Sequence, residues 1–126
     1  MARVLIVDDE HAARVILGEF LERAGHKVDF ASNGKEALRL YLEWSFDVVV
    51  TDLHMPEGDG LEFIKALREI LPETVIVAVS GKGPELLAEA EKEGVLAALS
   101  KPIDPKVLLE TVAQAVSGYE GSSVKE

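Results

Sequence analysis

Short apolar runs alternate along the chain with segments of helical spacing. Three of the runs are nearly continuous and rich in Val and Ile, as in parallel strands that are covered on both faces; they are RVLIV (3–7), DVVVT (47–51) and VIVAV (75–79). KVDFA (27–31) alternates instead, with Val28 and Phe30 on one side, which is typical of an edge strand. VLAAL (95–99) is a weaker fifth candidate.

Apolar residues spaced three and four apart predict a helix after each of these runs. The predicted helices cover residues 11–24, 33–44, 60–71, 83–94 and 104–116. Their ends carry start and stop signals, such as the cap residue Asn33 and the pair Asp104–Pro105. The apolar stripes that we expect to face the core include Ile16, Trp44, Ile70 and Leu71.

Five strand–helix pairs in succession predict an α/β fold with a doubly wound, parallel five-stranded sheet of the flavodoxin-like type. Right-handed crossovers and an edge position for residues 27–31 favour the strand order 2-1-3-4-5. In such a sheet, ligands bind outside the carboxyl ends of the strands where the winding reverses, here between strands 1 and 3.

A surplus of acidic residues restricts the expected partners. The 126 residues include 13 Lys and Arg against 23 Asp and Glu, so direct binding to nucleic acid or to an anionic membrane is not expected. The chain has no cysteine, which excludes disulfides and thiol catalysis. We expect one domain at 1–118, followed by a flexible tail or the start of a linker at 119–126. The apolar runs are too short for a signal peptide or a membrane span, so we expect a cytoplasmic location.

The predicted strands end in side chains that can carry chemistry. Carboxylates at the ends of two neighbouring strands, without His or Cys ligands, suit a hard cation such as Mg²⁺. A carboxylate beside that ion can act as a nucleophile toward phosphorus, while an amine and a hydroxyl stabilise the phosphoryl oxygens. The residues at these strand ends are Asp8, Asp9, Asp52, Ser80 and Lys101.

Four motifs in order, VLIVDDE, VVVTDLHMPEGDG, VIVAVSG and LAALSKP, resemble those of the response-regulator receiver domains of two-component signalling, a family that includes the single-domain chemotaxis regulators. The resemblance extends over residues 3–117. It implies a phosphoprotein that receives a phosphoryl group from a sensor histidine kinase or a phosphotransfer protein. Such a chain assists its own phosphorylation and dephosphorylation and is not a turnover enzyme on an external substrate.

The resemblance also implies the role of each site residue. Asp52 would be the phosphoacceptor, and Ser80 and Lys101 would contact the phosphoryl oxygens. Mg²⁺, for which Mn²⁺ can substitute, would be held by the carboxylates of Asp8, Asp9 and Asp52 and by the backbone carbonyl of His54. The peptide bond between Lys101 and Pro102 would be cis.

Three positions depart from the usual family pattern. Ala98 stands where Tyr or Phe commonly reports phosphorylation, Gly81 where Ala is common, and His54 where His is infrequent. We expect His54, Gly81 and Lys82 to modulate the phosphoryl lifetime, with the His54 and Lys82 side chains along the path of the hydrolytic water. In place of the missing ring, the loop GKGP (81–84) is expected to switch the fourth helix.

Output is expected through the face made by the fourth helix, the fifth strand and the fifth helix, which would bind a downstream protein or a second copy of the chain. Other functions share part of the pattern. A flavodoxin-like FMN binder needs a glycine-rich phosphate loop where this chain has DDEHAA (8–13), and a haloacid-dehalogenase-type phosphatase needs Asp at position 54. A pseudo-receiver, or a phosphorelay docking module without a conventional aromatic switch, stays open as the alternative.

Overall fold

The computed structural model describes residues 2–55, 60–81 and 83–124, those after Val116 by their backbone alone. Strands and helices alternate, as the apolar pattern predicts. The strands are β1 (Arg3–Val7), β2 (Lys27–Ala31), β3 (Val48–Asp52), β4 (Ile76–Ser80) and β5 (Ala97–Ser100). The helices are α1 (His11–Arg23), α2 (Gly34–Glu43), α3 (Gly60–Ile70), α4 (Pro84–Glu91) and α5 (Pro105–Val124).

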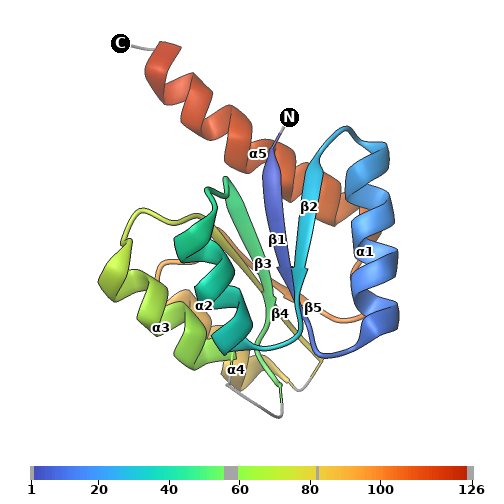
Figure 1. Cartoon of the computed structure of the whole chain (residues 1–126), viewed down its shortest axis with the longest axis vertical. Coiled ribbons are helices and arrows are strands. Elements are labelled where there is room, and N and C mark those ends of the chain that lie inside the picture. Colours follow the sequence, from blue (N-terminus) through green and yellow to red (C-terminus); the bar gives the residue numbers. More distant parts are fainter. Residues whose placement is uncertain (1, 56–59, 82, 125–126) are drawn as a thin grey trace.

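The strands form one parallel sheet in the order β2-β1-β3-β4-β5, with β2 at one edge (Figure 1). The predicted fold class, strand order and edge strand are therefore confirmed. Because β1 pairs with β3 in register, with Val7 opposite Thr51, the two strands end side by side. This register brings the acids that follow β1 next to the acid that ends β3.

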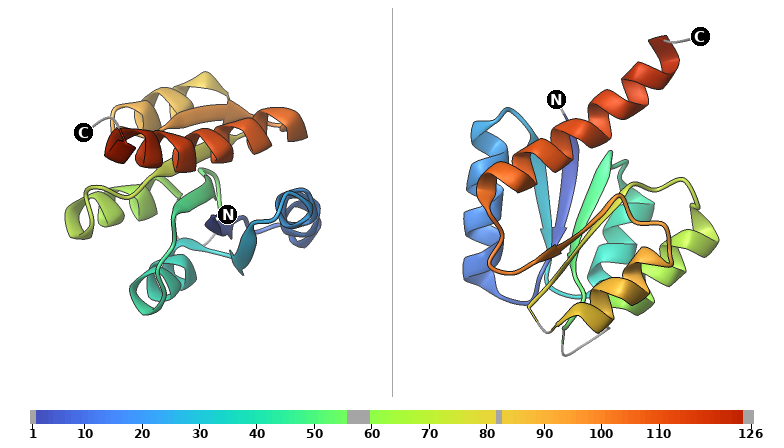
Figure 2. Two further views of the ribbon diagram at one scale, coloured as in Figure 1. Left: turned by 90° about the horizontal axis from the view of Figure 1, so that it is seen from above. Right: turned by 180° about the vertical axis from the view of Figure 1, so that it is seen from behind.

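Helices cover both faces of the sheet, with α1 and α5 on one face and α2, α3 and α4 on the other (Figures 1 and 2). Alternate residues of β1 divide between the two cores, because successive side chains of a strand point to opposite faces. Val4 and Ile6 pack in the core that contains Leu21 of α1, whereas Leu5 and Val7 pack in the core beneath α2 and α3.

The strand boundaries differ from the predicted ones at the site. β3 and β4 each begin and end one residue later than predicted, so Asp52 and Ser80 are the last residues of their strands. The parallel ladder extends this far because Asp52 pairs with Val79 and Ser80 pairs with Ser100. The two polar side chains thus have strand backbones that fix their direction.

The core-facing stripe of α1 is narrower than predicted. Leu21 is fully buried and Leu17 packs against the same core, but Ile16 is 55% exposed, so its predicted place in the core is wrong. Ile16 instead lines a groove of about 460 Å³ with Pro102 and Ile103, which lie after β5. The helix α1 therefore covers the strands with only part of its apolar surface.

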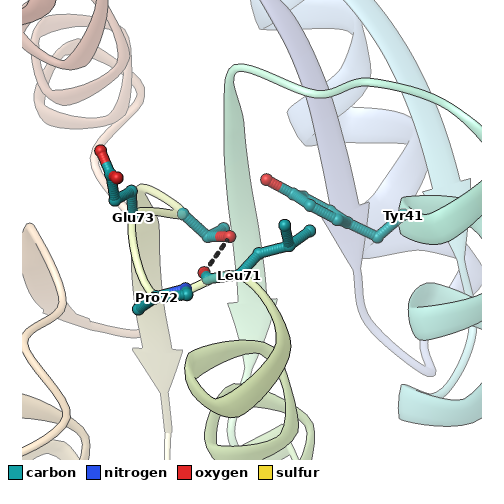
Figure 3. A pocket seen from close by; sticks show the side chains of 5 residues that line it. Tyr41, Leu71, Pro72 and Glu73 are labelled. Atoms are coloured by element: carbon teal, nitrogen blue, oxygen red, sulfur yellow. Dashed lines mark hydrogen bonds between the residues drawn. The ribbon is translucent and has the colours of Figure 1, made fainter.

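Three other stripe residues are also exposed, contrary to prediction. Trp44 is 53% exposed, and the Arg3 guanidinium lies over its ring, 5.1 Å from the centroid. Ile70 and Leu71 are exposed at the end of α3. Leu71 and Tyr41 line a pocket of about 270 Å³ beside the turn that follows α3 (Figure 3). These residues lie where a helix ends and the chain turns back toward the sheet, so strands do not cover them.

The last helix is longer than predicted. α5 continues to Val124, so the backbone is helical over 119–124, where the sequence predicted a tail. Leu108 and Val112 attach its first part to the core, and its later part extends past the sheet (Figure 1). The domain boundary at 118 stays a prediction. In the described ranges, the structure has no helix with the length and apolar character that a membrane crossing needs.

His26 links the start of β1 to the start of β2. Its Nδ1 atom accepts a hydrogen bond of 3.0 Å from the backbone N–H of Ala2, so this nitrogen must be unprotonated. Partial burial lowers the pKa of His26 below its ordinary value of 6.5. In the folded protein, the neutral imidazole is therefore favoured over the charged one.

This contact predicts a loss of stability on mild acidification. As the pH falls through about 6.5, the unfolded chain gains a proton on His26 before the folded chain does, so the free energy of unfolding decreases. His26→Gln keeps a hydrogen-bond acceptor but does not titrate. The free energy of unfolding of this variant should therefore decrease less than that of the wild type between pH 7 and the lowered pKa of His26. Urea unfolding at several pH values measures the difference, with His11→Gln, at an exposed position, as control. Parallel curves for wild type and His26→Gln would contradict the assignment.

Candidate functional site

Three carboxylates meet at the carboxyl ends of β1 and β3. Asp8, Asp9 and Asp52 each offer one oxygen, and these oxygens lie within 4.8 Å of one another. Asp8 and Asp52 are only 2% and 6% exposed, whereas Asp9 is open to solvent. Like charges this close and this buried repel strongly unless a cation lies among them.

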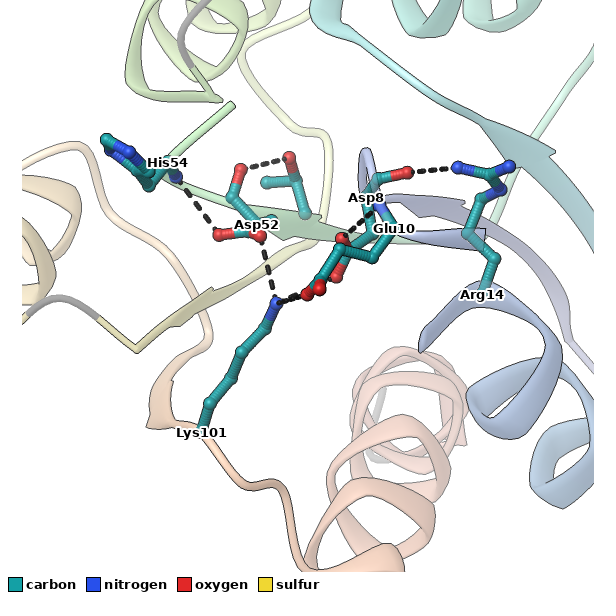
Figure 4. A network of polar contacts seen from close by, with 7 residues as sticks. Asp8, Glu10, Arg14, Asp52, His54 and Lys101 are labelled. Carbon is teal, nitrogen blue, oxygen red and sulfur yellow. Dashed lines mark hydrogen bonds and ion pairs between the residues drawn. The ribbon is translucent and has the colours of Figure 1, made fainter. Parts of the chain in front are cut away.

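Lys101 supplies that cation (Figure 4). Its Nζ atom lies 2.9 Å from Asp8 Oδ2 and 2.9 Å from Asp52 Oδ2, and so forms two charge-assisted hydrogen bonds. Partial burial acts to lower the pKa of Lys101, but the hydrogen bonds and charges of Asp52 and Asp8 outweigh it, so the pKa is raised. Lys101 thus stays protonated at neutral pH and bridges the two strands.

Backbone groups fix the direction of the two buried carboxylates. Asp52 Oδ1 accepts a hydrogen bond of 3.0 Å from the backbone N–H of His54, and Asp8 Oδ1 accepts one of 3.0 Å from that of Glu10. In both acids the other oxygen contacts Lys101. Gly60, the first residue of α3, lies so close that a Cβ atom there would overlap the backbone carbonyl of Asp52. Any larger residue at this position would displace the Asp52 backbone.

Sequence reasoning missed two contributors to the site. Glu10 Oε1 lies 3.9 Å from Lys101 Nζ and adds a fourth acid at the rim. Arg14, from the first turns of α1, donates from Nη1 to the backbone carbonyl of Asp8 at 2.6 Å, and so holds the end of β1 (Figure 4). The run DDE contained a signal for Glu10, but nothing in residue type indicates that Arg14 bonds a backbone carbonyl.

The other predicted site residues lie around this cluster with different exposure. Ser80 is buried at the end of β4, and its backbone carbonyl accepts from the Lys101 N–H at 2.9 Å. The Lys101–Pro102 peptide bond is cis, as predicted. Ala98 is half-buried on β5 and pairs with Ala78, so no ring occupies the position of the usual aromatic switch.

The residues of the predicted switch loop are only partly described. Gly81 is exposed, and Lys82 lies outside the described residues. Gly83 has a φ of 123°, a backbone conformation that residues with a side chain rarely adopt, whereas the φ of Gly81 is not positive. Only the second glycine thus uses the conformational freedom that was expected of both.

His54 is exposed, and its ring extends away from the Asp52 carboxylate in Figure 4. Its side chain nevertheless lines the same pocket as the acids. This pocket has a volume of about 260 Å³ and is lined by Asp9, Glu10, Asp52, His54, Gly81 and Lys101. Several of the lining residues are exposed, so the pocket is open to solvent, and its volume is large enough for a phosphoryl group.

The donor set fits Mg²⁺. All three close ligands are carboxylate oxygens from described residues, and hard divalent cations prefer oxygen. Three carboxylates against one ammonium leave an excess of negative charge, which a divalent cation offsets. The arrangement can therefore bind a metal ion and stabilise a phosphoryl group beside a buried carboxylate.

Comparisons with known proteins agree with this geometry. The chain is 36% identical over 116 residues to the sensory/regulatory protein RpfC of Xanthomonas campestris pv. campestris, which covers 88% of the chain but only 16% of RpfC. It is 37% identical over 112 residues to the chemotaxis protein CheY of Thermotoga maritima, covering 87% of the chain and 93% of CheY.

The fold is shared with the beryllofluoride-activated NtrC4 receiver domain, solved in solution as a dimer. The TM-score is 0.86 and the identity 36%, over 93% of this chain and 98% of that one. The sequence also matches the response regulator receiver domain family over residues 4–113, which is most of its length. The chain therefore belongs to the response regulator receiver domains.

Proposed function

We propose that this chain accepts a phosphoryl group on Asp52 from a sensor histidine kinase or a phosphotransfer protein, in a reaction that requires Mg²⁺. The observation that carries the proposal is the Lys101 ammonium, 2.9 Å from both Asp8 and Asp52. A nucleophile, an acid for metal binding and a fixed cation thus meet at one edge of the sheet. Receiver domains are signalling modules that interact with histidine kinases and downstream effectors, which supports the same assignment.

The metal ligands that we propose are the carboxylates of Asp8, Asp9 and Asp52 and the backbone carbonyl of His54. Asp9 is assigned as a direct ligand because its carboxylate is solvent-exposed and belongs to the cluster. When bound, Mg²⁺ supplies positive charge for the phosphoryl oxygens. Mn²⁺ is expected to substitute, since carboxylate and carbonyl oxygens suit both ions.

Asp52 acts as the nucleophile. Its carboxylate oxygen forms a bond to phosphorus while the bond from phosphorus to the donor imidazole nitrogen breaks and the imidazole leaves with the electron pair. We propose that Lys101, which now bonds Asp52, bonds the phosphoryl oxygens and that Ser80 donates a further hydrogen bond to them. Attack by water later releases phosphate and restores the Asp52 carboxylate.

The chain thus assists its own phosphorylation and hydrolysis and does not turn over an external substrate. We place it in the cytoplasm, where sensor kinases present their phosphohistidine. We assign residues 1–118 to the receiver domain and 119–126 to a tail or linker. Because the chain covers 16% of RpfC but 93% of CheY, these relatives support both an embedded and a stand-alone domain.

Output is proposed to pass through the face made by α4, β5 and α5, toward a downstream protein or a second copy of the chain. Leu96, just before β5, and Val107, in α5, are exposed apolar residues. The NtrC4 receiver, a dimer when activated by beryllofluoride, supports the second possibility. Ala98 favours an alternative, a pseudo-receiver or phosphorelay docking module, because an alanine cannot report phosphorylation by reorienting a ring.

Phosphorylation should require Asp52 and Mg²⁺. Incubation with a small phosphodonor and Mg²⁺ should add the mass of one phosphoryl group, measured by intact-protein mass spectrometry. Asp52→Asn should abolish the addition, because an amide is not a competent nucleophile, and removal of metal should abolish it in the wild type. Asp29→Asn, at a carboxylate that pairs with Arg3 on the far side of β1, is the matched control. Unchanged labelling of Asp52→Asn would reject the assignment.

His54→Ala should change the rate of dephosphorylation more than the rate of phosphorylation. The exposed His54 side chain lines the pocket of the acids, and we expect it to lie on the path of the hydrolytic water and not to contact the phosphoryl oxygens. Phosphoryl loss after removal of the donor and phosphoryl gain on its addition measure the two rates separately. Equal changes in both rates would show that the ring does not act on the water.

A phosphoryl mimic should alter the segment between β4 and the end of α4. Beryllofluoride with Mg²⁺ should change amide hydrogen exchange within residues 80–94, because Ser80 follows the residue that pairs with Asp52 and Gly83 caps α4. Hydrogen-exchange mass spectrometry with and without the mimic measures this. Unchanged exchange in this segment with the mimic bound would favour the pseudo-receiver or docking module.

A further inference from the structure

Arg68, in the last turns of α3, uses its guanidinium to bond four backbone carbonyls. Nε donates to the carbonyl of Glu93 at 2.6 Å and Nη2 to that of Gly94 at 2.9 Å. Nη1 donates to the carbonyls of Pro72 at 3.1 Å and Thr74 at 2.6 Å. A single planar cation thus joins two connections, α3–β4 and α4–β5, that are separated in sequence by the whole of β4 and α4.

The α3–β4 side of this junction is a turn closed by two hydrogen bonds. Thr74 bonds back to the carbonyl of Leu71 with both its N–H, at 3.1 Å, and its hydroxyl, at 2.8 Å, the second of which is drawn in Figure 3. The turn leads directly into β4, whose residues are all buried. Arg68 is therefore anchored to the sheet.

The other side is the C-terminal end of α4. The N–H groups of Glu93 and Gly94 close the last helical turn on Ala90 and Glu91 at 2.9 and 3.0 Å. Glu93 and Gly94 follow the last helical residue, Glu91, so the cation that bonds their two carbonyls fixes the turn that ends α4. Ala90, fully buried, packs the same end against the core.

The N-terminal end of α4 is held less firmly. Its cap residue is Gly83, which has no side chain to cap the helix. The next two residues, Pro84 and Glu85, are exposed. This end follows β4 and lies beside the proposed phosphoryl site, whereas the fixed end lies at the opposite end of the strands.

We propose that Arg68 is the pivot of the switch: α4 turns about its Arg68-bound end when its N-terminal end responds to phosphorylation. Arg68 is a positioning residue, not a catalytic one, since its bonds reach only backbone carbonyls away from Asp52. The turning of α4 rests on the proposed function, whereas the bonds between Arg68 and the turn that ends α4 do not. The device converts a local change at residues 80–84 into a tilt of α4 against β5.

The anchor is tested first without any ligand. Arg68→Met keeps an apolar stem and removes the donors, and Arg68→Lys keeps one charge without the fork. Hydrogen exchange at the amides of residues 93–96 should rise about tenfold in Arg68→Met and less in Arg68→Lys. The amides of β1 and β3 report the global stability of the fold, so the increase in exchange at residues 93–96 must exceed any increase at those amides. Arg39→Met, at an exposed arginine of α2 whose ion pair is 4.0 Å long, is the control.

The pivot is tested with beryllofluoride and Mg²⁺, after ¹⁹F NMR shows that the mimic binds. In the wild type, exchange should change at residues 84–89 and by less than about twofold at 93–96. In Arg68→Met, the mimic should also change exchange at 93–96. In Arg39→Met, the wild-type pattern should persist.

Two results would overturn the pivot: equal changes at both ends of α4 in the wild type, or identical responses in Arg68→Met and Arg39→Met. Failure of the mimic to bind would reject the proposed function and the switching motion with it. The ligand-free exchange at 93–96 would still decide whether Arg68 anchors α4, so the two failures are distinguishable.

Discussion

The structure depends on one compensation of charge, the Lys101 ammonium between the buried carboxylates of Asp8 and Asp52. Asp8 follows β1 and Asp52 ends β3, and each is almost completely removed from water. Without a cation between them, two such carboxylates would repel each other across the ends of the strands. With Lys101 at 2.9 Å from both, its positive charge offsets theirs and the ends of β1, β3 and β5 are held together.

The strand order makes this compensation possible. The chain passes from β1 out to the edge strand β2 and then back across, so β3 pairs with β1 and places Asp52 beside Asp8. β4 separates β3 from β5, and Lys101 follows β5, so only a long side chain reaches the acids from there. The lysine stem runs past Gly81, where an added Cβ would be in ordinary contact at 3.5 Å. Space alone therefore does not require glycine at that position.

Much of this was predictable because residue type and position carried it. Runs of Val and Ile indicated the buried strands, and the rule that ligands bind at the carboxyl ends of parallel strands brought Asp8, Asp52 and Lys101 together. Exposure was less predictable: Ile16 and Trp44 fit an apolar stripe by spacing, but spacing does not tell how far the sheet extends beneath a helix. The bonds of Arg14 and Arg68 were not predictable, since their acceptors are backbone carbonyls, which every residue has.

Lys101 and Arg68 differ in whether their hydrogen-bond acceptors can also bind another cation or ligand. Lys101 bonds carboxylates that a metal ion and a phosphoryl group also attract, so its partners can change with the state of the site. Arg68 bonds only backbone carbonyls in the connections that follow α3 and α4, and none of these bonds reaches the acids of the site. A switch needs both kinds of contact. One end of the moving element must respond to the new charge, and the other must stay fixed so that the response becomes a rotation of α4 and not a general loosening.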